Sequence, residues 1–358
     1  MKAAIYSPYL DTFGGGERYM LTIAELLSKK SFKVDVILNE QLNSLDGEYL
    51  KSELSKRFNL NLINVNFIKG PLGKGSNFLE RFFFLKKYDV LFYLTDGSIF
   101  YPSSKQNILH IQSPLLGESA KSLWRKIKLN GWDLVIYNSR FTKQNSQKNW
   151  PISSKIIYPP VDVIKIKPLQ KKKYILSVGR FFGYLKDKKH EILIKTFKEI
   201  LKEDILNGWS LHLVGSAGDG DKKYLDELKN LAKGFPIKFY PNLDYDDLKT
   251  LYGESSIYWH ASGYGEDDPA KMEHFGISTC EAMTGGCVPV VIGKGGQVEI
   301  VDNKIGGFLW DNLSQLKSYT LKLIKDENLR KKMGKEAVRK SKDFSKENFR
   351  KKIMNIIT

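Results

Sequence analysis

Short runs of apolar residues, many of them β-branched or aromatic, alternate along the chain with longer segments that have helical periodicity. In the first half, the apolar runs predict strands over residues 3–7, 34–39, 62–68, 90–95, 107–112 and 134–138. The helical patterns between them include residues 17–28, 77–87 and 120–130. Strands that alternate with helices in this way are typical of a parallel α/β sheet.

A second series of strands follows a segment rich in lysine and proline. It predicts strands over residues 174–178, 210–214, 237–240, 257–260 and 288–292. We therefore expect an α/β protein with two Rossmann-like, doubly wound domains, residues 1–165 and 166–342, that face a central cleft. Sheets of this kind bind ligands beyond the carboxyl ends of their strands. The last forty-odd residues are helical and charged and have no strand pattern.

Length and composition favour a globular protein without a membrane-spanning segment. A chain of 358 residues, 42% hydrophobic and 27% charged, is long enough for two globular cores. No apolar run reaches the roughly 18 residues of a membrane span. Pro8 and Asp11 interrupt the N-terminal segment, so we expect a cytoplasmic protein without a signal peptide. Cys280 and Cys287 fit no zinc or redox spacing, and we expect both side chains to be buried.

The net charge of +17 is compatible with several partners. Nucleic acid, an anionic membrane surface, phosphorylated substrates and an ordinary lysine-rich solvated surface all fit it. Residues 78–88 and 123–132 combine basic and aromatic side chains, which suits either core packing or peripheral binding at the inner membrane face. No RNA- or DNA-binding module is recognisable, so we expect no nucleic-acid partner.

A glycine-rich turn follows the first predicted strand. Gly14, Gly15 and Gly16 lie between this strand and the first helix. Glycine lets the backbone approach a ligand closely, and the helix N-terminus favours an anion. The spacing differs from the G-x-G-x-x-G dinucleotide fingerprint, so the turn alone predicts only an anionic ligand or a structural turn.

The first strand of the second domain also ends in a glycine turn, at Gly179 and Arg180. Lys186, Lys188 and Lys189 follow before the next helix. Arginine offers a fork of donors and lysine a compact charge, so together they suit a diphosphate. A solvated basic loop is the alternative.

The most informative segment contains two glutamates eight positions apart. If a helix begins near Gly276, Glu273 lies in the loop before it and Glu281 lies about a turn and a half inside it. The free N–H groups of Gly276 and Ile277 would then face a phosphate. Glu281 could accept both hydroxyls of a ribose. Glu273 would stand over a sugar, where it can bind a hydroxyl or stabilise developing positive charge.

With these residues the chain resembles the retaining glycosyltransferases of GT-B fold, whose hallmark is E-x7-E. The matching segments are residues 14–18, 138–142, 158–162, 177–180, 273–281 and 295–301. Gly-Gly-Gly-Glu-Arg together with Glu-His-Phe-Gly-Ile is especially similar to mannosyltransferases that extend lipid-linked oligosaccharides. The resemblance implies transfer of a hexosyl group from a nucleotide sugar, with GDP-mannose favoured, to a glycan or lipid-linked acceptor. It also implies that no metal ion or other cofactor is required.

The resemblance extends to single residues. Arg180 matches the family's phosphate arginine, and the downstream alignment selects Lys188 as the accompanying lysine, with Lys186 as the alternative. The full set expected to bind the donor is Gly15, Gly16, Arg180, Lys188, Phe275, Gly276, Ile277 and Glu281. A C-terminal helix over residues 343–358 is expected to pack back on the first domain.

Two polar residues end strands in the first domain. The resemblance places His110 beside the donor sugar and the acceptor, as a catalytic residue together with Glu273. Its neutral imidazole would orient a hydroxyl or donate a hydrogen bond to the sugar. Asp96 ends the preceding strand and would position the acceptor. For both residues a structural role is the alternative.

Other functions fit parts of the pattern. A UDP-sugar-dependent glycosyltransferase, a sugar-nucleotide epimerase and a phosphorylase share the expected fold, and a basic nucleic-acid-binding protein fits the net charge. Asp219-Gly220-Asp221 is similar to a metal-binding D-x-D motif, although we interpret it as a turn and helix cap. Residues 265–269, with His260 and His274, could hold a divalent ion. We interpret them instead as a flexible loop in front of Glu273.

Overall fold

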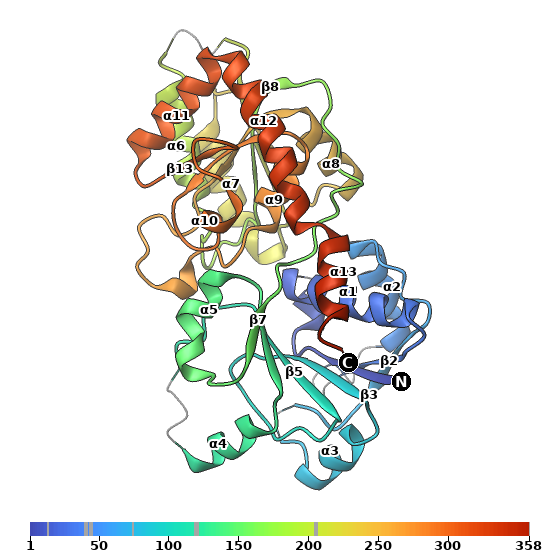
Figure 1. Ribbon diagram of the computed structural model, residues 1–358. Helices are drawn as coiled ribbons and strands as arrows, with labels where there is room; N and C mark the ends of the chain where they lie inside the picture. Colours follow the sequence, from blue (N-terminus) through green and yellow to red (C-terminus); the bar gives the residue numbers. More distant parts are fainter. Residues whose placement is uncertain are drawn as a thin grey trace. The chain divides into compact units, whose positions relative to one another are not determined.

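The computed structural model describes residues 1–12, 14–38, 42, 46–73, 75–117, 122–203 and 207–357. The chain divides into two compact units, each with a parallel sheet (Figure 1). The first consists of Met1–Pro160 and Glu347–Thr358, and the second consists of Val161–Lys346. This confirms the predicted α/β class with two doubly wound sheets.

The first unit is built on a seven-stranded parallel sheet of order β3-β2-β1-β4-β5-β6-β7. Its central strands are buried on both faces, as expected where helices cover a parallel sheet. The strands are β1 (Lys2–Tyr6), β2 (Lys33–Leu38), β3 (Val65–Lys69), β4 (Val90–Leu94), β5 (Gln106–Ile111), β6 (Leu134–Tyr137) and β7 (Ser154–Ile156). The helices are α1 (Gly15–Lys29), α2 (Gly47–Phe58), α3 (Phe78–Leu85), α4 (Leu123–Asn130), α5 (Arg140–Ser146) and α13 (Lys346–Met354).

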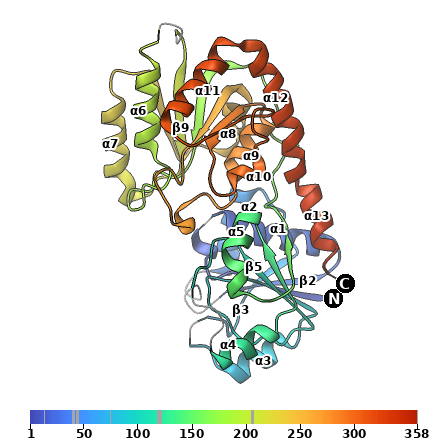
Figure 2. The same cartoon turned by 60° about the vertical axis from the view of Figure 1, so that its left-hand side comes forward.

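The C-terminal helix α13 lies beside α1 of the first unit (Figure 2). Phe349 packs edge-on against Tyr19 with ring centroids 4.8 Å apart, and Nη2 of Arg350 donates to Oε2 of Glu25 at 2.9 Å. Phe349 and Ile353 are both buried in the core between α1 and the sheet. An apolar face and one ion pair therefore attach this helix to α1.

The second unit is built on a six-stranded parallel sheet of order β10-β9-β8-β11-β12-β13. One core cluster joins these strands to helices α6, α7, α11 and α12. The strands are β8 (Lys172–Val178), β9 (Ser210–Gly215), β10 (Ile237–Pro241), β11 (Ser255–His260), β12 (Val288–Ile292) and β13 (Phe308–Trp310). The helices are α6 (His190–Ile200), α7 (Lys222–Ala232), α8 (Tyr245–Glu254), α9 (Ile277–Thr284), α10 (Gln297–Ile300), α11 (Leu313–Lys325) and α12 (Glu327–Ser341).

The second unit begins at Val161, five residues before the predicted boundary at 165/166. The N–H of Val161 donates to the carbonyl of Phe344 at 2.9 Å, and its own carbonyl accepts from the N–H of Lys346 at 3.1 Å. The same contacts keep the short 3-10 helix Lys342–Phe344 in the second unit, although the expected C-terminal helix began at residue 343.

All predicted strands are present, with ends shifted by at most three residues. Asn39 at the end of the second predicted strand and Ala120 at the start of a predicted helix lie outside the described residues. Strands β7 and β13 were not predicted, because three residues are too few to show an alternating pattern. None of the helices in the described part of the chain has the length and apolar character that a membrane crossing requires.

Candidate functional site

The N-terminus of α9 depends on the glycine that precedes it. Gly276 is the N-cap residue and has φ 114°, in the region that favours glycine. A Cβ at this position would lie 2.7 Å from Nε2 of Gln297. The helix begins at Ile277, and its first amide groups have no intrahelical acceptor. As their spacing predicted, Glu273 lies in the loop before α9 and Glu281 lies within the helix.

Two further glycines hold the backbone of the Glu273 loop against the turn between β12 and α10. The N–H of Gly296 donates to the carbonyl of Glu273 at 2.7 Å. Gly295 has φ 64°, and a Cβ on it would overlap the same carbonyl oxygen. A Cβ on Gly296 would lie 2.5 Å from the carbonyl oxygen of His274. Only glycines allow this approach, and it positions the loop in front of α9.

The Glu273 carboxylate is paired within the second unit. Its Oε2 lies 2.9 Å from Nζ of Lys188 and 3.1 Å from Nε2 of His260, and its side chain is 20% exposed. Burial alone would raise the pKa of Glu273, but the Lys188 charge and the His260 hydrogen bond hold that pKa well below the ordinary value. At neutral pH the carboxylate is ionised. No side chain in the described ranges hydrogen-bonds its Oε1, which leaves this oxygen for a ligand.

The side chains of Lys186 and Lys188, in the loop between β8 and α6, point in different directions. Lys186 and Lys189 have left-handed backbone conformations, with φ 47° and 54°. Lys188 passes beneath Gly179, where a Cβ would lie 2.7 Å from the lysine Cγ, and reaches Glu273. Lys186 turns toward α7 instead, and its Nζ lies 3.3 Å from Oε2 of Glu227. Of the two lysines left open by the sequence, Lys188 is therefore the one beside Glu273.

Arg180 is the second residue after the end of β8 and is exposed. Its guanidinium lies 5.6 Å from the ring centroid of Phe182, and no carboxylate in the described part of the chain forms an ion pair with it. Burial lowers the pKa of Lys188, but the charges of Glu273 and Asp187 outweigh it and raise that pKa above the ordinary value; the Arg180 charge opposes this rise only weakly. Arg180 and Lys188 thus form a cationic pair at the end of one strand, which suits a diphosphate.

Glu281 is buried on α9 and oriented by a tyrosine. The hydroxyl of Tyr252 on α8 donates to its Oε2 at 3.1 Å. Burial and the neighbouring carboxylate raise the pKa of Tyr252 well above its ordinary value, so the phenol keeps its proton and remains a donor. This contact orients the Glu281 carboxylate.

In the first unit, the glycine turn before α1 is closed by Glu17. The N–H of Gly14 donates to its Oε2 at 2.8 Å, and the hydroxyl of Ser7 lies 3.5 Å from its Oε1. Gly15 is the first residue of α1, and a Cβ on Gly16 would overlap the side-chain amide of Gln112 after β5. Phe13 in this turn lies outside the described residues. The glycines bring α1 close to the end of β5.

His110 is buried at the end of β5, with 1% of its surface exposed. Its ring stacks on that of Tyr19 with centroids 3.9 Å apart, and its Nδ1 lies 3.2 Å from the carbonyl of Ile136. Burial lowers the pKa of His110 to about 3, so the imidazole is neutral. A carbonyl partner requires the proton to be on Nδ1. Nε2 can then only accept a hydrogen bond, and it has no partner among the described residues.

Asp96 lies in the loop after β4 and makes an Asx-type turn. Its Oδ1 accepts from the N–H of Ser98 at 2.9 Å. The pKa of the Tyr9 phenol is raised by partial burial and by the charge and hydrogen bond of the Asp96 carboxylate. Asp96 also lines a cavity in the first unit. Its carboxylate is thus oriented by the loop itself.

The sequence did not predict the roles of three polar residues beside Glu273, Glu281 and Gly276 in the second unit. His260 was considered only as a metal ligand, yet it ends β11 and hydrogen-bonds Glu273. Tyr252 orients Glu281. Gln297 is fully buried beside Gly276, and neither polar atom of its amide has a partner in the described part of the chain. The position of His260 at a strand's carboxyl end was the one available signal.

The acidic sequences considered as metal sites have protein partners. Asp221 accepts from the N–H of Gly218 at 2.9 Å and from that of Gly183 at 3.0 Å, which makes it a turn-closing residue. Glu266 pairs with Lys189 at 2.6 Å. Within the described ranges, no group of three or more His, Cys, Asp or Glu side chains is arranged to hold a metal ion.

Comparison with known proteins places this geometry in context. Residues 162–340, half of the chain, match the family described as glycosyl transferases group 1. A GDP-Man:Man(3)GlcNAc(2)-PP-Dol alpha-1,2-mannosyltransferase of Dictyostelium discoideum is 29% identical over 247 residues, 63% of this chain and 46% of that protein. The mouse protein of the same name is 30% identical over 198 residues, 49% of this chain and 38% of its own. The chain spans less than half the length of these relatives.

Solved structures share the fold over the whole chain. A glycosyltransferase from Rickettsia africae superposes with a TM-score of 0.75 at 20% identity, covering 99% of this chain and 97% of that one. Anabaena Alr3699/HepE in complex with UDP and glucose superposes with a TM-score of 0.70 at 17% identity, covering 100% and 99%. At these identities the likeness shows the fold alone.

Proposed function

Because the chain belongs to the family of glycosyl transferases group 1, we propose that it is a retaining hexosyltransferase that moves mannose from GDP-mannose to a lipid-linked glycan. The names of its mannosyltransferase relatives support this choice of donor and acceptor. One observation carries the proposal: the Glu273 carboxylate, held ionised by Lys188 and His260, lies directly before the free amides of α9.

The second unit offers the groups that a nucleoside diphosphate sugar needs. Arg180, Lys188 and the N-terminal amides of α9 would neutralise the diphosphate, and Glu281 would accept the ribose hydroxyls. As the bond to the sugar breaks, negative charge grows on the diphosphate and positive charge grows on the sugar ring. The cations stabilise the first charge and Glu273 the second. Because protein groups supply this charge, the proposal includes no metal ion or cofactor.

Without a covalent intermediate on the protein, retention requires the acceptor hydroxyl to attack from the face that the diphosphate leaves. Such a step depends on positioning and charge stabilisation, and it needs no protein nucleophile. In the first unit, the neutral His110 supports the proposal with an acceptor atom at Nε2. In this proposal Nε2 receives a hydrogen bond from a sugar hydroxyl and orients it, and it does not act as a donor.

Thermal unfolding with GDP-mannose, UDP-glucose and ADP-glucose tests the choice of donor. A ligand at 100 times its Kd stabilises the protein by about 2.7 kcal/mol. For a domain of this size that corresponds to a rise in Tm of roughly 5–10 °C. We expect this rise with GDP-mannose, accompanied by slow release of GDP. A larger rise with UDP-glucose would favour the UDP-sugar alternative, and conversion to another GDP-sugar would favour the epimerase.

We further propose that an anionic membrane surface is a partner of the first unit. Helices α3 and α4 lie at the same end of this unit (Figure 2). The segment 100–103 hydrogen-bonds Phe82 on α3 and Trp132, two residues after the end of α4. Phe84 packs into the core, but Phe83 is 61% exposed and Trp124 is 73% exposed. The other exposed apolar residues on the two helices are Phe78, Leu79, Leu123 and Ile127. Exposed apolar side chains beside lysines suit the surface of an anionic bilayer.

Replacing Trp124 by glutamate is expected to weaken binding to vesicles that contain phosphatidylserine by about tenfold or more. The change removes an aromatic side chain that would insert into the bilayer, and it adds a negative charge that the anionic lipids repel. Vesicle co-sedimentation measures the partition coefficient. Tyr49→Glu is the matched control, since Tyr49 is an exposed aromatic residue on α2. Equal binding by the Trp124 variant and the unmodified protein would contradict a membrane role for this surface.

A further inference from the structure

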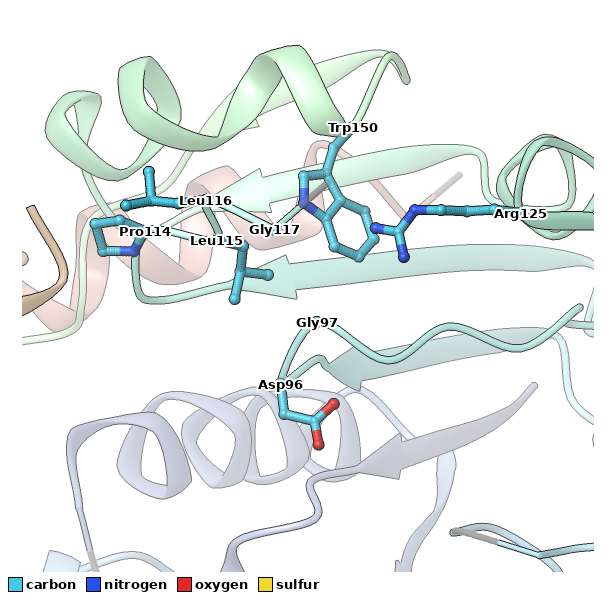
Figure 3. Close-up of a pocket in the computed structure, with 8 residues that line it drawn as sticks. All are labelled: Asp96, Gly97, Pro114, Leu115, Leu116, Gly117, Arg125 and Trp150. Atoms are coloured by element: carbon cyan, nitrogen blue, oxygen red, sulfur yellow. The ribbon is translucent and has the colours of Figure 1, made fainter. Parts of the chain in front are cut away.

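The first unit contains a cavity that Asp96 lines together with residues that have no role in the donor site proposed for the second unit. Its volume is about 240 Å³, and Figure 3 shows Trp150 on one side with Asp96 and Gly97 across from it. Residues 114–117, after β5, and Arg125 on α4 complete the wall. Pockets for drug-sized ligands measure roughly 300–1,000 Å³, so this cavity suits a smaller group such as one sugar ring or a phosphate.

The described part of the cavity wall carries a cation, Arg125, that forms no ion pair with it. The guanidinium carbon of Arg125 lies 5.0 Å from the ring centroid of Trp150, and this stacking fixes its orientation (Figure 3). No carboxylate in the described ranges forms an ion pair with Arg125. The Asp96 carboxylate is held by Ser98 and Tyr9 instead. The charge of Arg125 is therefore available to an anionic ligand.

Two buried donors beside the cavity also have no acceptor among the residues that the structure describes. The Nε–H of Arg125 and the indole N–H of Trp150 are buried, and neither has a hydrogen-bond partner in the described part of the chain. Buried donors are normally satisfied, so two of them on adjacent side chains indicate a missing acceptor group. Phosphate oxygens match both the fork of the guanidinium and a neighbouring N–H.

The loop that forms the apolar side of the cavity is anchored to the fold. The N–H of Leu115 donates to Oγ of Ser146 at 2.9 Å, and its carbonyl accepts from Nδ2 of Asn149 at 3.1 Å. The loop is thus tied to α5 and to the turn that leads to Trp150. Such a pre-formed site loses little conformational entropy when a ligand binds.

We propose that this cavity binds a glycosyl phosphate. The phosphate lies against Arg125 and the indole N–H of Trp150, the sugar ring packs against Leu115 and Gly97, and Asp96 accepts a sugar hydroxyl. The proposal rests on the proposed function, because the ligand would be the phosphate-bearing sugar of a lipid-linked acceptor. A neutral glycan would leave the two buried donors and the Arg125 charge unmatched, and a purely apolar ligand would do the same.

Isothermal titration of the full chain, with GDP present in saturating amount, tests the proposal directly. The probes are N-acetylglucosamine 1-phosphate, N-acetylglucosamine and inorganic phosphate. We expect the glycosyl phosphate to bind at least tenfold more tightly than either fragment. Arg125→Gln is expected to weaken its binding by at least tenfold, and Arg125→Lys by less. Lys148→Gln removes an exposed charge two residues from Trp150 and is expected to leave the affinity unchanged.

The outcomes separate this site from the proposed function. Equal affinity of Arg125→Gln and the unmodified protein for the glycosyl phosphate overturns the site, even if GDP-mannose is still turned over. Equal affinity for inorganic phosphate and the glycosyl phosphate overturns the sugar half of the proposal. Binding that depends on Arg125 in a protein that binds no nucleotide sugar supports the site and rejects the transferase. Trp150→Phe, which keeps the ring and removes the N–H, gives an independent measure if Arg125→Gln fails to fold.

Discussion

Replacing Glu273 by glutamine is expected to lower the rate of mannosyl transfer by about 10²–10³-fold, the loss found when one preorganised electrostatic contact is removed from an active site. Glutamine has the same shape but no charge, so it cannot stabilise positive charge on the sugar ring. The affinity for GDP is expected to stay within about threefold, because Arg180 and the amides of α9 are unchanged. Steady-state rates with GDP-mannose and titration with GDP measure the two effects.

Stability against pH provides a second test of the same residue. The folded pKa of Glu273 lies below its ordinary value of 4.5, so the pairing with Lys188 stabilises the fold above about pH 4.5 and is lost as the pH falls through the folded pKa. The difference in Tm between the glutamine variant and the unmodified protein is therefore expected in full at pH 7 and is expected to shrink as the pH falls below 4.5 toward the folded pKa. Glu254→Gln, which removes a surface partner of Lys172, is the control. Full transfer activity in Glu273→Gln would refute the assigned role.

The sequence predicted the fold and the positions of Glu273 and Glu281 relative to α9 for physical reasons. Parallel strands that are buried on both faces must be continuous apolar runs, and those runs can be recognised without knowing the fold. Strand β12 is an example, since all five of its residues are buried and its bounds were predicted exactly as observed. The position of Gly276 likewise predicted the start of α9, because few residues other than glycine adopt its φ of 114°.

The remaining features depend on contacts between residues far apart in the chain. Three lysines follow Arg180, and only the two left-handed residues around Lys188 direct it to Glu273. His260 is separated from Glu273 by thirteen positions, and no periodicity links them. His110 was expected to orient or donate, yet its Nδ1 contact restricts Nε2 to accepting a hydrogen bond. A sequence pattern specifies which side chains are available, whereas packing decides which of their atoms are free.

The basic and aromatic residues of α4 also could not be assigned a role from the sequence alone. The basic and aromatic residues of α4 were compatible with a membrane surface or with core packing. In the structure the side chains of this helix have three different environments: Leu129 is buried, Trp124 is exposed, and Arg125 lines a cavity with Trp150. Because neighbouring positions on a helix point in different directions, a single functional label for such a segment is too coarse.

Replacing Lys188 by methionine is expected to affect both donor binding and the protonation of Glu273. The side chain stays unbranched and flexible but loses its charge, so the affinity for GDP-mannose is expected to fall by about 10–100-fold, the contribution of a charge-assisted hydrogen bond. The pKa of Glu273 is also expected to rise in this variant, because burial raises it and the Lys188 charge that opposes the effect of burial is gone. We therefore expect the residual kcat to increase with pH between about 5 and 8, over the range in which the unmodified protein keeps Glu273 ionised.

Lys186→Met provides the comparison, since it removes the same charge two residues away. Lys186 pairs with Glu227 on α7 and Glu191 on α6, and its loss is expected to change KM for GDP-mannose by less than about threefold. Measuring kcat and KM from pH 5 to 9 for both variants separates the two lysines. Equal losses in the two variants would assign the diphosphate to Lys186 as well. A pH profile of Lys188→Met that superimposes on that of the unmodified protein would show that Lys188 does not control the ionisation of Glu273.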